Sequence, residues 1–432
     1  MLKNGGEWIT AVFKRYMPDA FVFALGLTVI TAVAAVVWTE SSAIETLQGW
    51  YQGFWMLLEF GMQMVLILVT GYSIALSPVA KKLIGKLTRV VRTPSHVYPF
   101  VIIVGMLLSA VSWGWLVITA VMARELALRI KGVNYPYLIA CVYFSGVIWV
   151  SGMSSSIPLL LNTENNFLIE AGVLSATIPT SQTLGTILNF SVVIFALIVG
   201  PLLFSVLVPK NGPQLEEMLE GDHKDEQSIV DEARTMNMSV PAVSDKLNNS
   251  SVLQYLIGLM GAAYIVYYFI TNGFDLNLNI MIFIFLVLGM FLHKTPMRYG
   301  IAMKRSSMNI SGILFQYPFY AGIMGIMIYT GLGELLAQKM ASVGNMSTYP
   351  IFAFISGGVV NFAVPSAGGE FAVIGPTIIK AVQDIGAGLP QAELVEMISR
   401  ASLSIAYGET LTNMLQPFYL LIILPVMGIG IK

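Results

Sequence analysis

The distribution of basic residues constrains this chain more than any other feature of its sequence. Lys and Arg are confined to short clusters, and long apolar segments lie between the clusters. Each segment contains at least one stretch of the ~20 apolar residues with which a helix crosses a bilayer. The segments without Lys or Arg are residues 16–80, 93–123, 132–209, 247–293, 306–338 and 340–379. The sequence therefore predicts an all-α polytopic membrane protein.

Composition supports this class and excludes others. Of the 432 residues, 56% are hydrophobic and 11% are charged, whereas soluble domains average roughly 25% charged residues. The net charge of −1 offers no basic surface for nucleic acid. Cys141 is the only cysteine, so no disulfide framework or cysteine-rich metal site is expected. We expect no cofactor and no buried His-based metal site, because the three histidines fall in loops or at span ends: His96, His223 and His293.

The apolar segments predict eight transmembrane spans. We place them near Asp19–Trp38, Phe54–Ser77, Tyr135–Leu161, Leu184–Val208, Ser251–Thr271, Leu278–Leu292, Ser311–Thr330 and Ser402–Pro425. The basic clusters between spans belong in the cytoplasm, because positively charged loops are retained there. The polar start of the chain has no small-residue cleavage pattern, so no signal peptide is expected. The N-terminus is therefore predicted to be cytoplasmic.

Residues 97–122 are long enough to span once, but both flanks are strongly basic. If this segment crossed, eleven Lys and Arg would move outside; if it returns, 20 of the 23 stay inside. We therefore predict a re-entrant hairpin, with its turn at Ser112-Trp113-Gly114-Trp115. A second hairpin is predicted by analogy over residues 349–379, which are interrupted at 361–369.

Four features recur in order in the two halves of the chain. A span ends in Thr-Gly, a Tyr-Pro hairpin follows, polar residues interrupt the hairpin, and the next span carries polar residues ahead of a proline. They occur at residues 70–71, 98–99, 112–114 and 151–158, and again at 330–331, 349–350, 361–363 and 407–417. The charge-derived topology runs the two copies in opposite directions, which predicts an inverted repeat with two broken transmembrane helices.

This pattern predicts five regions. They are an N-terminal transmembrane helix (1–48), a first repeat (49–209) with hairpin 97–122, a linker (210–246), scaffold helices (247–306) and a second repeat (307–432) with hairpin 349–379. The linker is rich in Glu and Asp, so we interpret it as a solvated, partly helical cytoplasmic connector.

Paired broken helices in inverted repeats are typical of secondary transporters. A broken helix exposes N–H and C=O groups, each costing several kcal/mol in lipid if unpaired. Such a break persists where water or a bound species completes it. Positive N-terminal ends of half-helices attract an anion, whereas unwound carbonyls and polar side chains can hold a cation.

The interruptions supply the candidate substrate-binding residues. Serines can instead bond to helix carbonyls, and the tryptophans can be core or interfacial residues. The candidates are Ser112, Trp113, Gly114, Trp115, Ser154, Ser155, Ser156, Asn361, Pro365, Ser366, Gly368, Gly369, Thr412 and Asn413.

The candidate ion-coupling residues are Glu370, Glu409 and Gln416. Acids at membrane depth are costly, so they are functional candidates; a structural hydrogen bond is the alternative reading. Na⁺ is the only metal ion considered, and its candidate positions are near Ser112, Ser154, Asn361 and Asn413.

Several longer stretches resemble the bacterial short-chain fatty acid transporter family, which is similar in outline to the sodium-dicarboxylate carriers. The stretches are residues 60–64, 293–297, 318–323, 361–366 and 406–409. The resemblance implies uptake of butyrate, acetoacetate or similar monocarboxylates across the bacterial inner membrane, with H⁺ or Na⁺ symport. It also implies an elevator-type movement and a homodimer.

Family members continue past the equivalent of Lys432 with one more hydrophobic helix, so a missing C-terminal helix is expected. Some members have histidine at the position of Glu370. The alternatives to a symporter are an uncoupled anion channel or facilitator and, less favoured, a membrane-embedded enzyme. No buried His and no paired Asp motif supports an enzyme.

Overall fold

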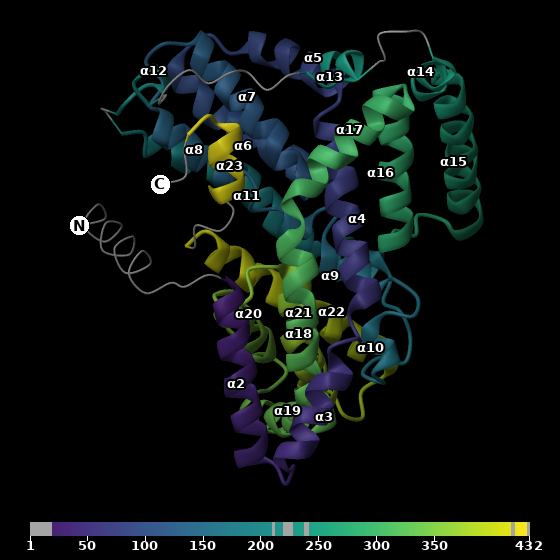
Figure 1. Ribbon diagram of the computed structural model, residues 1–432. Helices are drawn as coiled ribbons and strands as arrows, with labels where there is room; N and C mark the ends of the chain where they lie inside the picture. The colour runs from purple at the N-terminus through teal and green to yellow at the C-terminus, as the bar shows by residue number, and fades with distance from the viewer. Residues whose placement is uncertain (1–19, 210–211, 219–227, 237–241, 416–419, 430–432) are drawn as a thin grey trace. The chain divides into compact units, whose positions relative to one another are not determined.

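The computed structural model describes residues 20–209, 212–218, 228–236, 242–415 and 420–429. Within these ranges every regular element is an α-helix or a 3₁₀-helix (Figure 1). The chain divides into two compact units, and each unit gathers segments from distant parts of the sequence. All-helical architecture, the first expectation from the sequence, is confirmed.

Unit 1 lies within Met1–Gly61, Phe167–Ser175 and Ile313–Phe418. It holds most of α18 (Ser311–Tyr329), together with α2 (Ala20–Trp38), α3 (Ala43–Gly53), α10 (Phe167–Glu170), α19 (Leu332–Val343), α20 (Tyr349–Asn361), α21 (Ala367–Ile385) and α22 (Gln391–Asn413). The second predicted hairpin therefore belongs to the same unit as the first span.

Unit 2 lies within Met62–Asn166, Ala176–Gly312 and Tyr419–Lys432. It holds most of α4 (Leu58–Ala75), together with α5 (Pro78–Leu87), η1 (Thr88–Val90), α6 (Pro94–Val111), η2 (Trp113–Trp115), α7 (Leu116–Arg129), α8 (Tyr135–Phe144), η3 (Trp149–Ser151), α9 (Ser156–Leu161), η4 (Thr180–Gln182), α11 (Ile187–Val206), α12 (Leu215–Met218), α13 (Ile229–Thr235), α14 (Val243–Asn248), α15 (Ser251–Asn272), α16 (Leu278–His293), α17 (Pro296–Ser306), η5 (Ser307–Asn309) and α23 (Leu420–Val426).

Local chemistry explains where several of these helices begin. Ser77, Asn134 and Thr295 are N-caps whose side-chain oxygens accept from backbone N–H groups of the first turn. Each is followed within two residues by proline, which fits the first helical turn because its missing N–H would have no partner there. These short polar signals interrupt the apolar sequence and set the ends of the spans.

Six described segments, each a single helix or a run of consecutive helices, are long and apolar enough to cross a membrane: Phe21–Trp38, Leu58–Ala75, Pro94–Val111, Tyr135–Leu161, Ile187–Val206 and Val243–Asn272. Five of them coincide with predicted spans. Pro94–Val111 is the first arm of the predicted hairpin, and α16 is a shorter apolar helix. The chain is thus a multi-span membrane protein.

A sharp bend joins α18 to α19 in unit 1. The two helices meet at 72° and would pass as one span if taken together. Gly331 lies at the bend with φ of +73°, a left-handed conformation that glycine adopts without steric cost. Gly71, the matching Thr-Gly glycine of the first half, lies inside α4 instead. The recurring dipeptide therefore has two different structural roles.

Both predicted hairpins are interrupted where the sequence indicated. The first consists of α6 and α7, separated by extended Ser112 and η2. The second consists of α20 and α21, and residues 362–366 separate them. In the first predicted broken span, α8 ends at Phe144 and α9 starts only at Ser156.

The second predicted break, over residues 407–417, begins later than expected, because α22 is continuous through 407–413; Gln416 and Pro417 lie outside the described residues. α22 ends at Asn413, and the next described helix, α23, begins at Leu420. The side chains of Thr410 and Thr412 donate to helix carbonyls one turn earlier, those of Ala406 and Gly408. Polar residues that bond within their own helix leave it intact.

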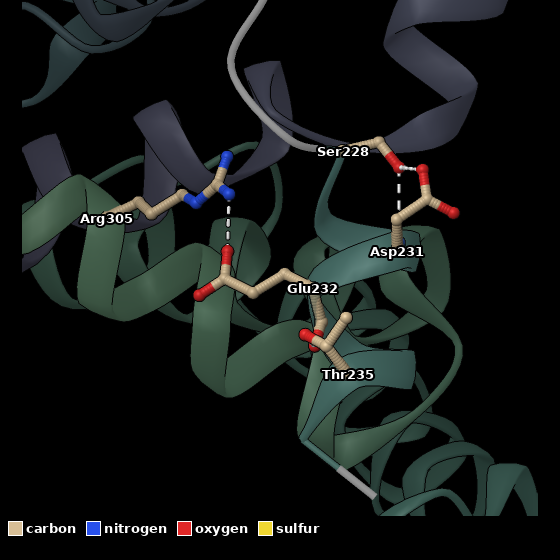
Figure 2. A network of polar contacts seen from close by, with 5 residues as sticks. All are labelled: Ser228, Asp231, Glu232, Thr235 and Arg305. Carbon is tan, nitrogen blue, oxygen red and sulfur yellow. Dashed lines mark hydrogen bonds and ion pairs between the residues drawn. The ribbon is translucent and has the colours of Figure 1, made fainter.

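The linker is partly helical in its described portions, and α13 packs against α17. Ile229 and Ala233 are buried with Ile301 and Ala302 in one apolar cluster. Glu232 accepts a hydrogen bond from Arg305 beside it (Figure 2). The linker is therefore more than a solvated connector, since its helix α13 packs on α17.

Candidate functional site

Asn361, the last residue of α20, connects the second hairpin to α22. Its amide nitrogen lies 2.8 Å from Thr412 Oγ1, 2.9 Å from Asn413 Oδ1 and 3.2 Å from the Glu409 carbonyl oxygen. Asn361 and Asn413 are almost completely buried. Three residues selected from the sequence as candidates thus form one buried polar cluster in unit 1.

Small residues let α20 and α22 approach closely enough for these bonds. A Cβ on Gly357 would lie 2.5 Å from the Ile405 carbonyl oxygen, and one on Gly358 would lie 3.2 Å from the Gly408 carbonyl oxygen. Since larger side chains would separate the two backbones, the glycines are what brings Asn361 within reach of α22.

The interruption after Asn361 packs against α18. Ser366 Oγ lies 3.0 Å from the hydroxyl oxygen of Tyr317. A Cβ on Gly368 would lie 2.8 Å from the same hydroxyl oxygen, and one on Gly369 would lie 2.8 Å from the Tyr320 ring. Pro365 is buried beside them. The candidate residues at this tip therefore lie beneath aromatic rings of α18.

The two predicted intramembrane acids lie in the same unit. Glu370 and Glu409 are both fully buried, and their carboxyl groups are close enough for their charges to interact. Asn413 Nδ2 donates to Glu409 Oε1 at 3.0 Å, which links this acid to the Asn361 cluster. Gln416, the third predicted ion-coupling residue, lies outside the described residues.

The first hairpin forms a separate cluster in unit 2. Ser112 is buried at the tip, and a Cβ on Gly71 of α4 would lie 2.5 Å from its hydroxyl oxygen. A Cβ on Gly114 would lie 2.9 Å from the Tyr72 backbone nitrogen. Trp115 stacks with Phe285 at a ring-centroid distance of 6.5 Å. Trp113 lies between Ser112 and Gly114 in the sequence and is the first residue of η2.

The broken span packs against this hairpin. The Met153 backbone N–H donates to the Ala110 carbonyl oxygen at 2.6 Å, just before the tip. Ser154, Ser155 and Ser156 are all buried. The Ser155 hydroxyl donates to the Val150 carbonyl oxygen at 2.5 Å, so this serine has a structural role in the helix break.

The candidate residues therefore fall into two clusters, one in each unit. Each cluster pairs a hairpin tip with the span that follows it in sequence order. Substrate and ion binding by these residues stays a prediction.

A polar cavity of about 900 Å³ lies elsewhere in unit 2, between η4 and the loop that joins α15 to α16. Asp275 accepts hydrogen bonds there from Asn162 and Tyr268, at 2.5 Å each. Its lining includes the acids Glu164 and Asp275 but no Lys or Arg. Because an acidic cavity repels carboxylates, it is a poor site for an anionic substrate.

Several residues around the candidate clusters were not selected from the sequence. Tyr317 and Tyr320 are spaced three residues apart on α18, so they share one helix face. Two tyrosines on one face of an apolar span indicate a face with polar groups to pair, and this signal was present in the sequence. The Asp275 network carried another, because residues 272–279 between two spans are rich in Asn and Asp. His293 was placed at a span end, but it is buried with Nε2 2.8 Å from the Ser73 carbonyl oxygen.

Comparison with known proteins identifies the chain. The model of the family described as "Short chain fatty acid transporter" matches residues 1–432. The chain belongs to this family. Because it is a transporter family, this member is not an enzyme, as its lack of a nucleophile–base pair had indicated.

Two curated relatives of this short-chain fatty acid transporter family member carry the same provisional name, short-chain fatty acid transporter. The protein from Escherichia coli (strain K12) is 35% identical over 433 residues, which cover 100% of this chain and 94% of the relative. The protein from Haemophilus influenzae is 35% identical over 439 residues, which cover 100% and 95%.

The fold also resembles a solved transporter. A crystal structure of the YdaH transporter of Alcanivorax borkumensis, whose topology is described as unusual, aligns with a TM-score of 0.53. The alignment covers 95% of this chain and 91% of that one at 16% sequence identity. At this identity the comparison concerns the fold alone.

Proposed function

We propose that this family member is a secondary active transporter that takes up butyrate, acetoacetate or similar short monocarboxylates by symport with H⁺ or Na⁺. The observation that carries the proposal is the buried Asn361 cluster beside an interrupted hairpin. A buried polar break in a membrane protein needs partners, and here α22 provides them. Substrate binding would use the remaining donors of the same tip.

The charges around this tip favour an exchangeable anion. Ser366 and the N-terminal turn of α21, which begins at Ala367, offer neutral donors and the positive end of a 19-residue helix. The described part of unit 1 contains only three basic residues, and each has a partner elsewhere. Weak neutral binding suits a carrier because the substrate must also leave.

We propose the same role for the first tip, with Ser112, Gly114 and Trp115 and the serines at 154–156 as a second set of contacts. The indole ring of Trp115 would contact the acyl chain. Oxygens near Ser112 and Ser154 in unit 2 and, separately, near Asn361 and Asn413 in unit 1 are the candidates for Na⁺ sites. Because the two sets lie in different units, mutating each set separately tests them independently.

The transport movement is proposed to be elevator-type alternating access by two inverted repeats with re-entrant hairpins. We further propose a homodimer in a bacterial inner membrane, with a cytoplasmic N-terminus. The two compact units support a mechanism of moving bodies, because each has its own internal packing.

Uptake of radiolabelled butyrate into proteoliposomes tests the function. Na⁺ and H⁺ gradients are imposed in separate runs, and protein-free liposomes measure the undissociated acid that crosses lipid unaided. We expect one gradient to accelerate uptake above this background and to drive accumulation. Uptake that is faster than background but never exceeds equilibrium under either gradient would instead identify an uncoupled channel or facilitator.

A further inference from the structure

Glu370 is unusual among the buried polar residues of unit 1. It is fully buried in the first turn of α21, the second arm of the hairpin, and no group in the described residues forms a hydrogen bond with either carboxyl oxygen. One oxygen faces α20, where a Cβ on Gly357 would lie 2.9 Å from it. The glycine therefore makes room for a carboxyl group that has no conventional partner.

No cation in the described part of unit 1 neutralises this group. Lys339 lies over the Trp38 ring, Lys380 pairs with Asp384, and Arg400 pairs with Glu396. The acid that faces Glu370 is Glu409 of α22, and the nearby titratable group of α18 is Tyr317. An ionised Glu370 would thus be a buried, unpaired charge next to a second carboxyl group.

A proton neutralises this buried charge better than a sodium ion does. Burying an isolated carboxylate is so costly that the group neutralises instead. Sodium would need several oxygen ligands around Glu370, and the described residues place no hydroxyl or amide on it. Oε2 of Glu409 likewise has no hydrogen-bond partner among them, whereas Oε1 accepts from Asn413. Two neighbouring carboxyls with three unused oxygens can hold a proton without rearrangement.

We propose that Glu370 and Glu409 form the proton-binding site of this transporter, and that H⁺ rather than Na⁺ is the coupling ion. The inference rests on the proposed function. In the conformation described here Glu370 holds the proton as an O–H bond, which breaks when the site opens to water. One proton moves with one monocarboxylate, so the transport cycle carries no net charge.

The test uses initial rates of butyrate uptake into proteoliposomes, after subtraction of the rate in protein-free liposomes. Wild type is expected to respond to an inward pH gradient and to ignore a Na⁺ gradient or a membrane potential. E370Q keeps a neutral side chain of the same size. It is expected to lose the response to pH while retaining counterflow exchange of labelled for unlabelled butyrate. Glu393, an exposed acid of α22, provides the matched control E393Q.

A second measurement does not depend on a variant folding. An apolar carbodiimide reacts with protonated carboxyls in apolar surroundings, so wild type is expected to be labelled at Glu370 or Glu409 and not at Glu393. Labelling at neither acid, stimulation of wild type by Na⁺, or an intact pH response in E370Q would each overturn the proton site. Absence of counterflow in the wild type would instead refute the proposed transport function itself.

Discussion

At the scale of single residues, Asn361 has the greatest structural consequence for the candidate site. It ends α20, and its amide meets three oxygens of α22. A buried acceptor that loses its donor costs roughly 1–3 kcal/mol. The side chain therefore both fixes the hairpin tip on α22 and sets the positions of Thr412 and Asn413.

Asn361→Ala and Ser366→Ala are each expected to abolish butyrate uptake while leaving membrane insertion intact. Asn361→Ala removes one donor from three acceptors of α22, and Ser366→Ala removes the hydroxyl shared with Tyr317. Uptake in proteoliposomes and the amount of inserted protein are measured together. Asn345→Ala, in the exposed turn before α20, is the control. Wild-type uptake in both variants would exclude this tip as the site.

The sequence identifies Asn361, Thr412 and Asn413 as candidates, but it does not show that they bond to one another. An Asn, a Pro and paired Gly within an apolar run indicate an interruption, because local chemistry opposes a continuous helix there. The partners of Asn361 lie 48 to 52 positions away. Which α22 residues they are depends on the packing of two helices, and that is a property of the tertiary fold.

At the scale of helices, two properties decide whether a residue interrupts a span: its backbone conformation, and whether its side chain forms a hydrogen bond within its own helix. Gly331 separates α18 from α19 because it is left-handed. Thr410 and Thr412 remain helical because their hydroxyls bond within α22. Composition alone does not distinguish these cases, which is why the sequence predicts a break over 407–417 although α22 is continuous as far as Asn413.

Gly331→Ala is expected to destabilise the protein by about 1–2 kcal/mol, because a side chain is strained at positive φ. Thermal unfolding in detergent measures the change. Gly300→Ala is the matched control: this glycine is exposed within α17 and a Cβ there meets nothing within 4 Å. The control should be neutral or stabilised by up to ~1 kcal/mol. Equal effects of the two substitutions would contradict the role of Gly331.

Ile229→Asp is expected to release α13 from α17. The change buries a charge in the apolar cluster, and a seven-residue helix has little stability of its own. Hydrogen exchange of residues 228–236 should become fast, although the Glu232–Arg305 contact is still possible (Figure 2). Val243→Asp, at an exposed position of α14, is the control. Unchanged protection in Ile229→Asp would show that α13 is held by other contacts.

At the scale of the whole molecule, the compact units do not follow the order of the chain. α2 and α3 belong with the second hairpin, whereas α23 belongs with the first. The reason is packing between distant glycines and aromatic rings, as where Gly53 of α3 meets the backbone of Gly325 in α18. The sequence predicts the helices and both interruptions, but a linear division into repeats carries no information about such contacts.

The positive-inside distribution makes a further prediction for the whole molecule, namely which ends of the spans face the cytoplasm. The linker should be cytoplasmic, and the loop between α15 and α16 should lie on the opposite side because α15 crosses between them.

Cys141 is buried, so the native protein should react little with a membrane-impermeant maleimide. In a Cys141→Ser background, Val243→Cys and Phe274→Cys give one reporter on each side, and both native side chains are highly exposed. Phe274→Cys should be labelled in intact cells whose outer membrane has been opened, and Val243→Cys only after the inner membrane is permeabilised. The reverse pattern would invert the topology, and with it the direction from which a proton reaches Glu370.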